Sequence, residues 1–587
     1  MMTAKRKEAI GQAVFAVAGA VCVTAVAAIF AFLIMRSIPA FGKIGILNFL
    51  GGTTWAPDRL DIYAGALSGS YGILPMIAGT FVGTAGAMLV GGFLGYFTAA
   101  FLVFWCPVRL RGVFSAVIDL LAGIPSVVYG FFGIAFLLPL LSRIAPNNGS
   151  GPAAVSLILG IMVLPTVVSL SRVALEAVPH SLYEGSVALG ATHTETVFRV
   201  ISPAAGSGIR ASFVLAIGRA MGETMAVVMV AGNAAVFPRG LFSSFRVLTA
   251  NIVMEMGYAG EVQEGALIAT GAVLLLLILA VNLVFGLTSG RIVRHATEKN
   301  VSRRGGMTLL PPKLLRGFAV ASGVLTGGVL ALLIGFVLVR GVPVLVRDPS
   351  VLYGRFEFGS GDITVLPALV STLWAVVLSL AFAVPVGIMT AIRLHEYAPR
   401  NGLATRVIRG SIDLLAGVPS IVYGLFGMIA FVPLFGGSGS ILAGSLTVSL
   451  MLLPVVVRST EESLRAVPDA LREGSLALGA GKLRTVFCVV LPSALPGILS
   501  AVILSMGRVI GESAPLLYTM GSVIKSVPHG IFDSGATLAV ALWQLSGEGW
   551  YINEAYATAV ILVVLVLLLN FIARLCAARL GKRMKGV

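Results

Sequence analysis

Two segments of this chain are nearly identical, although they lie far apart in the sequence. Residues 119–130 are DLLAGIPSVVYG and residues 413–424 are DLLAGVPSIVYG, so the only differences are exchanges between Ile and Val. A second similar pair follows in the same order, at residues 181–191 and 470–480. An internal repeat of this kind predicts two halves with the same fold.

The composition places both halves in a membrane. Of the 587 residues, 57% are hydrophobic and 11% are charged, and the mean hydropathy is +0.99, which excludes a set of soluble domains. A helix needs roughly 20 mainly apolar residues to cross a bilayer, and each half has six such segments. The segments are 11–35, 73–104, 113–141, 153–171, 209–231 and 264–288, then 317–339, 365–391, 407–434, 441–457, 498–520 and 556–573.

We therefore predict an all-α polytopic membrane protein with about twelve transmembrane helices, arranged as two homologous six-helix halves. The spans are predicted to be helices because lipid offers the backbone no hydrogen-bond partners. We assign residues 1–300 to the first half and 317–587 to the second. Residues 289–316, which are rich in Lys, Arg, Gly and Pro, are predicted to be a basic cytoplasmic linker.

The net charge of +16 is interpreted as an orientation signal. Most of the 41 Lys and Arg residues fall on the side of the predicted helices where the N-terminus lies, which the positive-inside rule assigns to the cytoplasm. Both termini are therefore predicted to be cytoplasmic, and no nucleic-acid partner is expected. The apolar run 11–35 is too long for a signal peptide and is predicted to be a retained span. No metal site is expected, because the Cys and His residues show no ligand spacing.

A long loop between the fourth and fifth spans of each half is predicted to contain a short amphipathic helix. Proline before the helix and glycine after it are the usual residues at these ends. Such a helix can fit a groove on a partner protein. The alternative is a helix lying on the lipid surface, but those usually have a basic polar face. The residues assigned to the partner contact are Pro179, Glu184, Gly185, Gly190, Pro468, Glu473, Gly474 and Gly479.

The two loops resemble the EAA loop of ATP-binding-cassette importer permeases. The shared pattern is Glu184-Gly185-Ser186, Gly190 and Pro203 in the first loop, and Glu473-Gly474-Ser475, Gly479 and Pro492 in the second. The resemblance implies that each loop docks on a separate ATPase subunit. The chain has no P-loop sequence, so ATP and Mg are expected to be bound by those partners. The chain itself is expected to be a transport subunit and not an enzyme.

The fifth predicted span of each half contains the segment Gly-Arg-x-x-Gly-Glu. The charged residues are Arg219 and Glu223 in the first half and Arg508 and Glu512 in the second. Their four-residue spacing predicts that each pair shares one face of a helix. A charge at mid-bilayer costs roughly 2.5 to 3.5 kcal/mol on the insertion scale, so we expect the two faces to line an interior path and to oppose each other.

The chemistry of these charged residues favours an oxyanion as the transported substrate. Planar guanidinium groups suit a tetrahedral oxyanion. Phosphate, unlike sulfate, keeps a proton at neutral pH, and a glutamate can accept a hydrogen bond from it. The alternative is an Arg–Glu pair that only holds helices together.

The third predicted span carries the sequence Pro-Ser-x-x-Tyr in both halves. We predict that Ser126, Tyr129, Ser420 and Tyr423 line the same path, because the proline breaks the helix and the two hydroxyl groups point to one side. The alternative is a kinked helix whose hydroxyl groups form hydrogen bonds within the bundle.

Nearly the whole chain resembles the bacterial Pst phosphate importer. The repeated segments, together with ANIVMEMG at residues 250–257, are similar to the PstC permease in the N-terminal half and to the PstA permease in the C-terminal half. The resemblance implies the type I ABC importer (MetI-like) permease fold, an inner-membrane location, two PstB-like ATPase subunits and a PstS-like extracytoplasmic phosphate-binding protein. It also implies ATP-driven phosphate import by alternating access. The alternatives are an importer of sulfate, molybdate or phosphonate, and an ion-gradient-driven secondary transporter.

Overall fold

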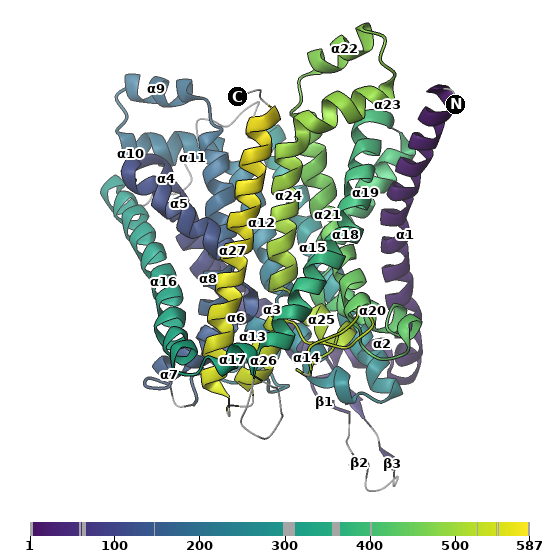
Figure 1. Ribbon diagram of the computed structural model, residues 1–587. Coiled ribbons are helices and arrows are strands. Elements are labelled where there is room, and N and C mark those ends of the chain that lie inside the picture. Colours follow the sequence, from purple (N-terminus) through teal and green to yellow (C-terminus); the bar gives the residue numbers. More distant parts are fainter. Residues whose placement is uncertain are drawn as a thin grey trace. The chain divides into compact units, whose positions relative to one another are not determined.

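The described part of the chain divides into two compact units. The computed structural model describes residues 4–57, 60–61, 66–67, 69–145, 147–296, 311–354, 364–399, 402–524, 526–547, 549 and 551–584. One unit is Pro39–Arg340, and the other combines Met1–Ile38 with Gly341–Val587. Helices dominate both units (Figure 1).

The unit Pro39–Arg340 contains the helices that follow α1 (Ala4–Ile44). They are α2 (Ile46–Gly51), α3 (Leu74–Ala87), α4 (Phe93–Phe104), α5 (Val108–Ala122), α6 (Ser126–Phe132), α7 (Leu138–Leu141), α8 (Pro152–Glu176), α9 (His180–Ala188), α10 (His193–Glu195), α11 (Ser202–Ala204), α12 (Gly206–Gly222), α13 (Met225–Val230), α14 (Leu248–Glu255), α15 (Glu261–Ala296) and most of α16 (Pro312–Arg347). The π-helical turns η1 (Met88–Gly92), η2 (Gly133–Leu137) and η3 (Thr196–Ile201) and the 3-10 turn η4 (Met256–Tyr258) adjoin them. Short strands pair antiparallel, β1 (Trp55–Ala56) with β4 (Ser70–Tyr71) and β2 (Leu60–Asp61) with β3 (Ala66–Leu67).

The second unit repeats much of this order. Its helices after α1 are α17 (Ser350–Tyr353), α18 (Leu366–Ile392), α19 (Leu403–Gly417), α20 (Ser420–Ala430), α21 (Ile441–Arg465), α22 (Asp469–Ala477), α23 (Lys482–Thr485), α24 (Leu491–Gly511), α25 (Ala514–Thr519), α26 (Leu538–Gly547) and α27 (Ile552–Met584). It also contains the π-helical turns η5 (Arg393–Tyr397) and η7 (Val486–Val490) and the 3-10 turn η6 (Pro433–Phe435).

The first helix of each sequence half belongs mainly to the compact unit that the other half forms. In the unit with the C-terminal half, Phe15 of α1 lies 5.4 Å from Tyr397 between ring centroids, and Cys22 Sγ lies 3.7 Å from Thr390 Oγ1. In the other unit, Thr326 of α16 forms a hydrogen bond of 2.9 Å with Thr98 of α4. The repeat boundary therefore does not coincide with the boundary of the compact units.

Both ends of the predicted linker 289–316 are helical. Helix α15 extends to Ala296 and α16 begins at Pro312. Residues 297–310 lie outside the described residues.

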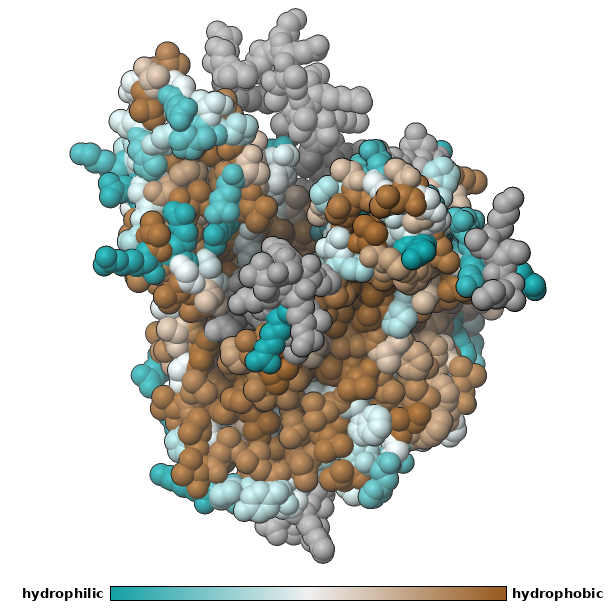
Figure 2. Space-filling view, turned by 45° about the horizontal axis from the view of Figure 1, so that its top comes forward, coloured by the Kyte–Doolittle hydropathy of each residue, from teal (hydrophilic) through white to brown (hydrophobic). Residues whose placement is uncertain are grey.

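The prediction of an all-α polytopic membrane protein built as two helical halves is confirmed. In the described part of the chain, nine helices are long and apolar enough to cross a membrane, or up to eleven if two bent pairs count as spans. These bent pairs are His193–Ala204 with Gly206–Gly222, at 71°, and Leu403–Gly417 with Ser420–Ala430, at 104°. The predicted span 113–141 is divided into α5, α6, η2 and α7. Figure 2 shows a broad apolar band on the visible face, with polar residues at its margins.

Proline explains why the third predicted span is broken in both halves. Pro125 and Pro419 precede α6 and α20, and their ψ angles are 142° and 145°, which end the preceding helix. Proline has no backbone N–H to donate and disfavours helix in the residue before it. The two halves therefore contain the same helix–bend–helix element instead of one straight span.

Candidate functional site

Arg219 lies in the last turn of α12, and Glu223 lies just beyond the end of this helix. The helix ends at Gly222, and Glu223 has an extended backbone with φ −71° and ψ 137°. Thr249 Oγ1 donates a hydrogen bond of 2.8 Å to the carbonyl oxygen of Glu223, which satisfies one acceptor at the break. The prediction that Arg219 and Glu223 share a helical face is therefore wrong. Glycine is a poor helix former, and it stands where the helix ends.

The Arg219 side chain is exposed and contacts a neighbouring helix. Its Nη1 donates a hydrogen bond of 3.1 Å to Thr166 Oγ1 of α8. Within the described residues, no ion pair joins Arg219 to Glu223. Arg219 is thus oriented by a neutral hydroxyl group and keeps its net positive charge.

The second half repeats the break with a different partner for its arginine. Helix α24 ends at Gly511, and Glu512 is extended, with φ −80° and ψ 134°. Arg508 Nε lies 3.7 Å from Glu512 Oε1, and the Arg508 side chain is 42% exposed. The Glu512 side chain is 19% exposed, so this ion pair is partly buried.

The third-span repeat packs beside the fifth-span break in each unit. Helix α6 packs on α13, and α20 packs on α25. A Cβ atom at Gly130 would lie 3.0 Å from the Cα of Ala226, and one at Gly424 would lie 2.9 Å from the Cα of Pro515. These glycines allow the close approach of the two backbones. Two motifs that are distant in sequence thus come together in each half.

The tyrosines of this repeat are buried, whereas the serines are partly exposed. Tyr129 is 1% exposed and donates a hydrogen bond of 2.9 Å to the carbonyl oxygen of Leu121; Tyr423 is 0% exposed and donates one of 2.8 Å to Leu415. Each bond bridges the bend between two helices. The tyrosine geometry favours the alternative of hydrogen bonds within the bundle, while Ser126 and Ser420 keep accessible hydroxyl groups.

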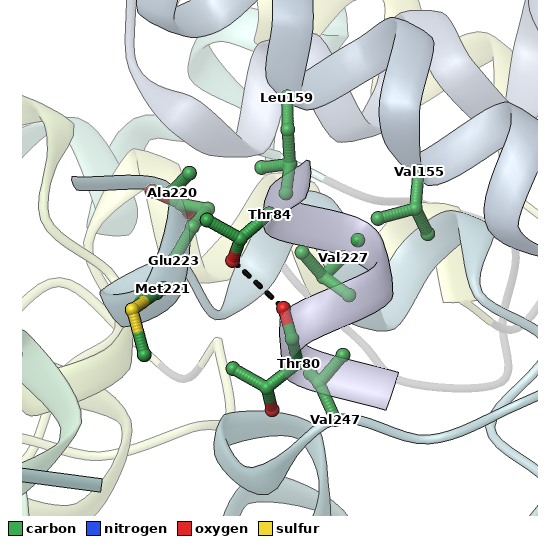
Figure 3. Close-up of a pocket in the computed structure, with 10 residues that line it drawn as sticks. Thr80, Thr84, Val155, Leu159, Ala220, Met221, Glu223, Val227 and Val247 are labelled. Carbon is green, nitrogen blue, oxygen red and sulfur yellow. Dashed lines mark hydrogen bonds between the residues drawn. The ribbon is translucent and has the colours of Figure 1, made fainter. Parts of the chain in front are cut away.

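A small pocket adjoins the first break (Figure 3). It is lined by Thr80 and Thr84 of α3, Leu159 of α8, and Glu223. Thr84 Oγ1 donates a hydrogen bond of 2.7 Å to the Thr80 carbonyl oxygen. This bond lies within the part of α3 that lines the pocket. The pocket gives the Glu223 segment a partly polar neighbourhood inside an otherwise apolar bundle.

The predicted loop helices are present in both halves as α9 and α22. Pro179 and Pro468 immediately precede them, and Gly190 and Gly479 follow them in the left-handed conformation, with φ of 86° and 82°. Neither helix has a buried residue. Leu189 and Leu478 are each 91% exposed. The contact residues Glu184, Gly185, Glu473 and Gly474 are exposed as well.

A matched hydroxyl pair joins each loop helix to the segment that follows it. Ser186 bonds to Thr196 and Ser475 bonds to Thr485, both at 2.9 Å between oxygens. The equality of the two distances shows that both loops have the same local fold.

The loop helices are anchored to the bundles by different side chains, which the sequence analysis missed. In α22, Arg472 donates to Glu396 over 3.0 Å and to the Leu464 carbonyl oxygen over 2.7 Å. In α9, the matching residue is Tyr183, whose hydroxyl lies 2.8 Å from His193 Nδ1. His193 in turn packs against Trp105 at 5.4 Å between ring centroids. The signal in the sequence was the Tyr/Arg difference inside an otherwise similar repeat.

The described residues contain no group of three or more His, Cys, Asp or Glu side chains that could hold a metal ion. The features that both halves repeat are an exposed arginine at a helix break and an exposed loop helix. Repeated membrane bundles with these two features define a multi-pass membrane transport permease.

A comparison with known protein families identifies the family of this permease. Residues 91–294 and 383–586 each match the family described as "Binding-protein-dependent transport system inner membrane component", and the chain belongs to this family. The two matches correspond to the two halves of the internal repeat. The protein is therefore a membrane component of a binding-protein-dependent transport system.

Several curated relatives are similar to this chain. It is 29% identical to a phosphate transport system permease protein PstA homolog of Mycoplasma pneumoniae, over 84% of this chain and 85% of the relative. It is 42% identical to PstA of Mycobacterium leprae, over 36% of this chain and 69% of the relative. It is 32% identical to PstC of Mesorhizobium japonicum, over 41% of this chain and 76% of the relative.

Proposed function

We propose that this chain is the transmembrane permease subunit of an ATP-driven importer of inorganic phosphate. The observation that carries the proposal is the repeated helix break with an exposed arginine, Arg219 in one half and Arg508 in the other. The names of the relatives, which are phosphate transport permeases of both PstA and PstC type, support phosphate as the substrate. The halves 1–300 and 317–587 then serve as the PstC-like and PstA-like parts.

The arginines would bind the anion directly. A guanidinium group donates several hydrogen bonds in a plane, and bonds to an ionised partner are about twice as strong as neutral ones. Glu223 and Glu512 follow the arginines by four residues in the sequence and would accept a hydrogen bond from the proton of hydrogen phosphate. Sulfate lacks this proton, so the same glutamates would repel it. Ser126 and Ser420 would add hydroxyl groups along the path.

The loop helices α9 and α22 would dock on two copies of a PstB-like ATPase subunit. Their exposed leucines and the bare surface at Gly185 and Gly474 suit insertion into a groove. The ATPase subunits would bind ATP and Mg, and a PstS-like protein would deliver phosphate from outside the cytoplasm. Both termini would lie in the cytoplasm, together with α9 and α22.

Transport would follow an alternating-access cycle. ATP-driven closure of the ATPase pair would move α9 and α22, and the bundles would open outward. Phosphate from the binding protein would reach the arginines, and hydrolysis would return the bundles to an inward-open state.

Reconstitution in proteoliposomes tests the proposal. The chain, its ATPase and its binding protein should take up labelled phosphate only with ATP and Mg, and excess unlabelled phosphate should compete better than sulfate or molybdate. ATP-independent uptake that collapses with an ionophore would instead indicate a secondary transporter.

A further inference from the structure

The last membrane helix of each half contains one isolated polar residue. Asn282 of α15 is the sole polar side chain in residues 271–284, and Asn570 of α27 is the sole one in residues 559–573. An amide in a long apolar run costs free energy unless it finds a hydrogen-bond partner. Its occurrence at matching places in both halves therefore calls for a partner at matching places.

Both asparagines face the glycine that immediately precedes the arginine of the helix break. A Cβ atom at Gly218 would lie 3.9 Å from Asn282 Oδ1, and a Cβ atom at Gly507 would lie 3.9 Å from Asn570 Oδ1. Helix α12 packs on α15, and α24 packs on α27. The same contact is thus present independently in each unit.

In the part of the chain that the structure describes, neither the Asn282 nor the Asn570 side chain has a hydrogen-bond partner, and both are partly exposed. A half-turn about the last side-chain bond exchanges the NH2 group and the oxygen without changing the packing. Each amide can therefore offer two N–H donors next to the glycine that precedes the arginine.

We propose that Asn282 and Asn570 are substrate-binding residues, each of which donates hydrogen bonds to an oxyanion bound by the arginine of its own half, Arg219 or Arg508. This inference rests on the proposed function as an anion importer. Each half then contributes a guanidinium from its fifth predicted span and an amide from its sixth. Glycine at positions 218 and 507 leaves room for the anion to reach both groups.

The test measures the phosphate concentration that half-saturates uptake by the reconstituted complex. Loss of one hydrogen bond to a charged ligand should raise this concentration about tenfold or more in Asn282→Ala and in Asn570→Ala. Asn282→Asp keeps the shape but adds a negative charge, and it should raise the concentration further. Basal ATP hydrolysis without phosphate and the amount of folded complex should remain at the wild-type level.

Matched controls distinguish binding from packing. Leu283→Ala and Leu568→Ala change exposed neighbours on the same helices and should leave half-saturation unchanged. If the amides only pack the helices, the Ala variants will lose stability or maximal rate at an unchanged half-saturation, and the inference is overturned. Absence of phosphate uptake by the wild-type complex would instead refute the proposed function itself.

Discussion

Arg472 Nε and Glu396 Oε1 lie 3.0 Å apart, and this ion pair joins the loop helix α22 to the π-helical turn η5 that follows α18. The Arg472 side chain is 14% exposed and that of Glu396 is 8% exposed. Removing one partner of a buried pair leaves an uncompensated charge and typically costs about 3 to 5 kcal/mol.

We expect Arg472→Ala to loosen α22 and to reduce phosphate-stimulated ATP hydrolysis strongly, without changing half-saturation by phosphate. Hydrogen exchange of residues 469–477 measures the loosening. Asp469→Asn is the control, because Asp469 is 84% exposed and its loss leaves the Glu396 contact intact. Unchanged exchange in Arg472→Ala would show that the ion pair does not hold the helix.

The arginines at the breaks should determine substrate affinity. Each of Arg219→Ala and Arg508→Ala removes charge-assisted hydrogen bonds worth about 1.5 to 3 kcal/mol, so half-saturation should rise by roughly 10- to 100-fold. The Lys variants keep the charge but lose the planar fork, and they should fall between Ala and wild type. Thr166→Val removes only the Arg219 hydroxyl partner and serves as the control. Normal uptake by the double Ala variant would exclude both arginines from the path.

The two buried tyrosines should affect stability and not affinity. Tyr129→Phe removes one of two hydrogen bonds to the Leu121 carbonyl oxygen, which still accepts the Ile124 N–H, so the expected cost is about 0.5 to 1.5 kcal/mol. The midpoint of thermal unfolding in detergent should drop by a few degrees, and Tyr423→Phe should behave alike. Tyr258, which is 93% exposed, gives the control Tyr258→Phe. If a Phe variant changes the phosphate concentration that half-saturates uptake but keeps normal stability, the tyrosines line the substrate path.

A side chain added to a loop helix should block ATPase docking without disturbing this chain. A Cβ atom at Gly185 or Gly474 would meet nothing within 4 Å, so Gly185→Leu and Gly474→Leu fit the fold. Co-purification of the ATPase should be lost if the glycines face its groove. His180→Ala, at an exposed position of the same loop helix α9, should retain the ATPase. Retention of the ATPase by the double Leu variant would contradict the docking proposal.

Local sequence signals predicted the loop helices well. Proline and glycine affect the backbone of the helical turn in which they lie, so Pro179 and Gly190 were enough to predict where α9 begins and ends. The break at Glu223 was missed because a four-residue spacing is also compatible with a continuous helix, and only Gly222 hinted at its end. The Tyr129 bond to Leu121 depends on the bend between two helices, which periodicity alone does not specify. Asn282 was overlooked, although an amide inside an apolar run is visible in the sequence.

The exchange of first helices determines when α1 can reach its packing partners during synthesis. Helix α1 is made first, but its packing partners in α18 and η5 belong to residues 366–397. Helix α1 therefore stays in the bilayer without these packing partners until the ribosome has synthesised the first half. A ribosome pause or truncation before residue 366 would leave α1 without its native neighbours and available to membrane quality-control proteases.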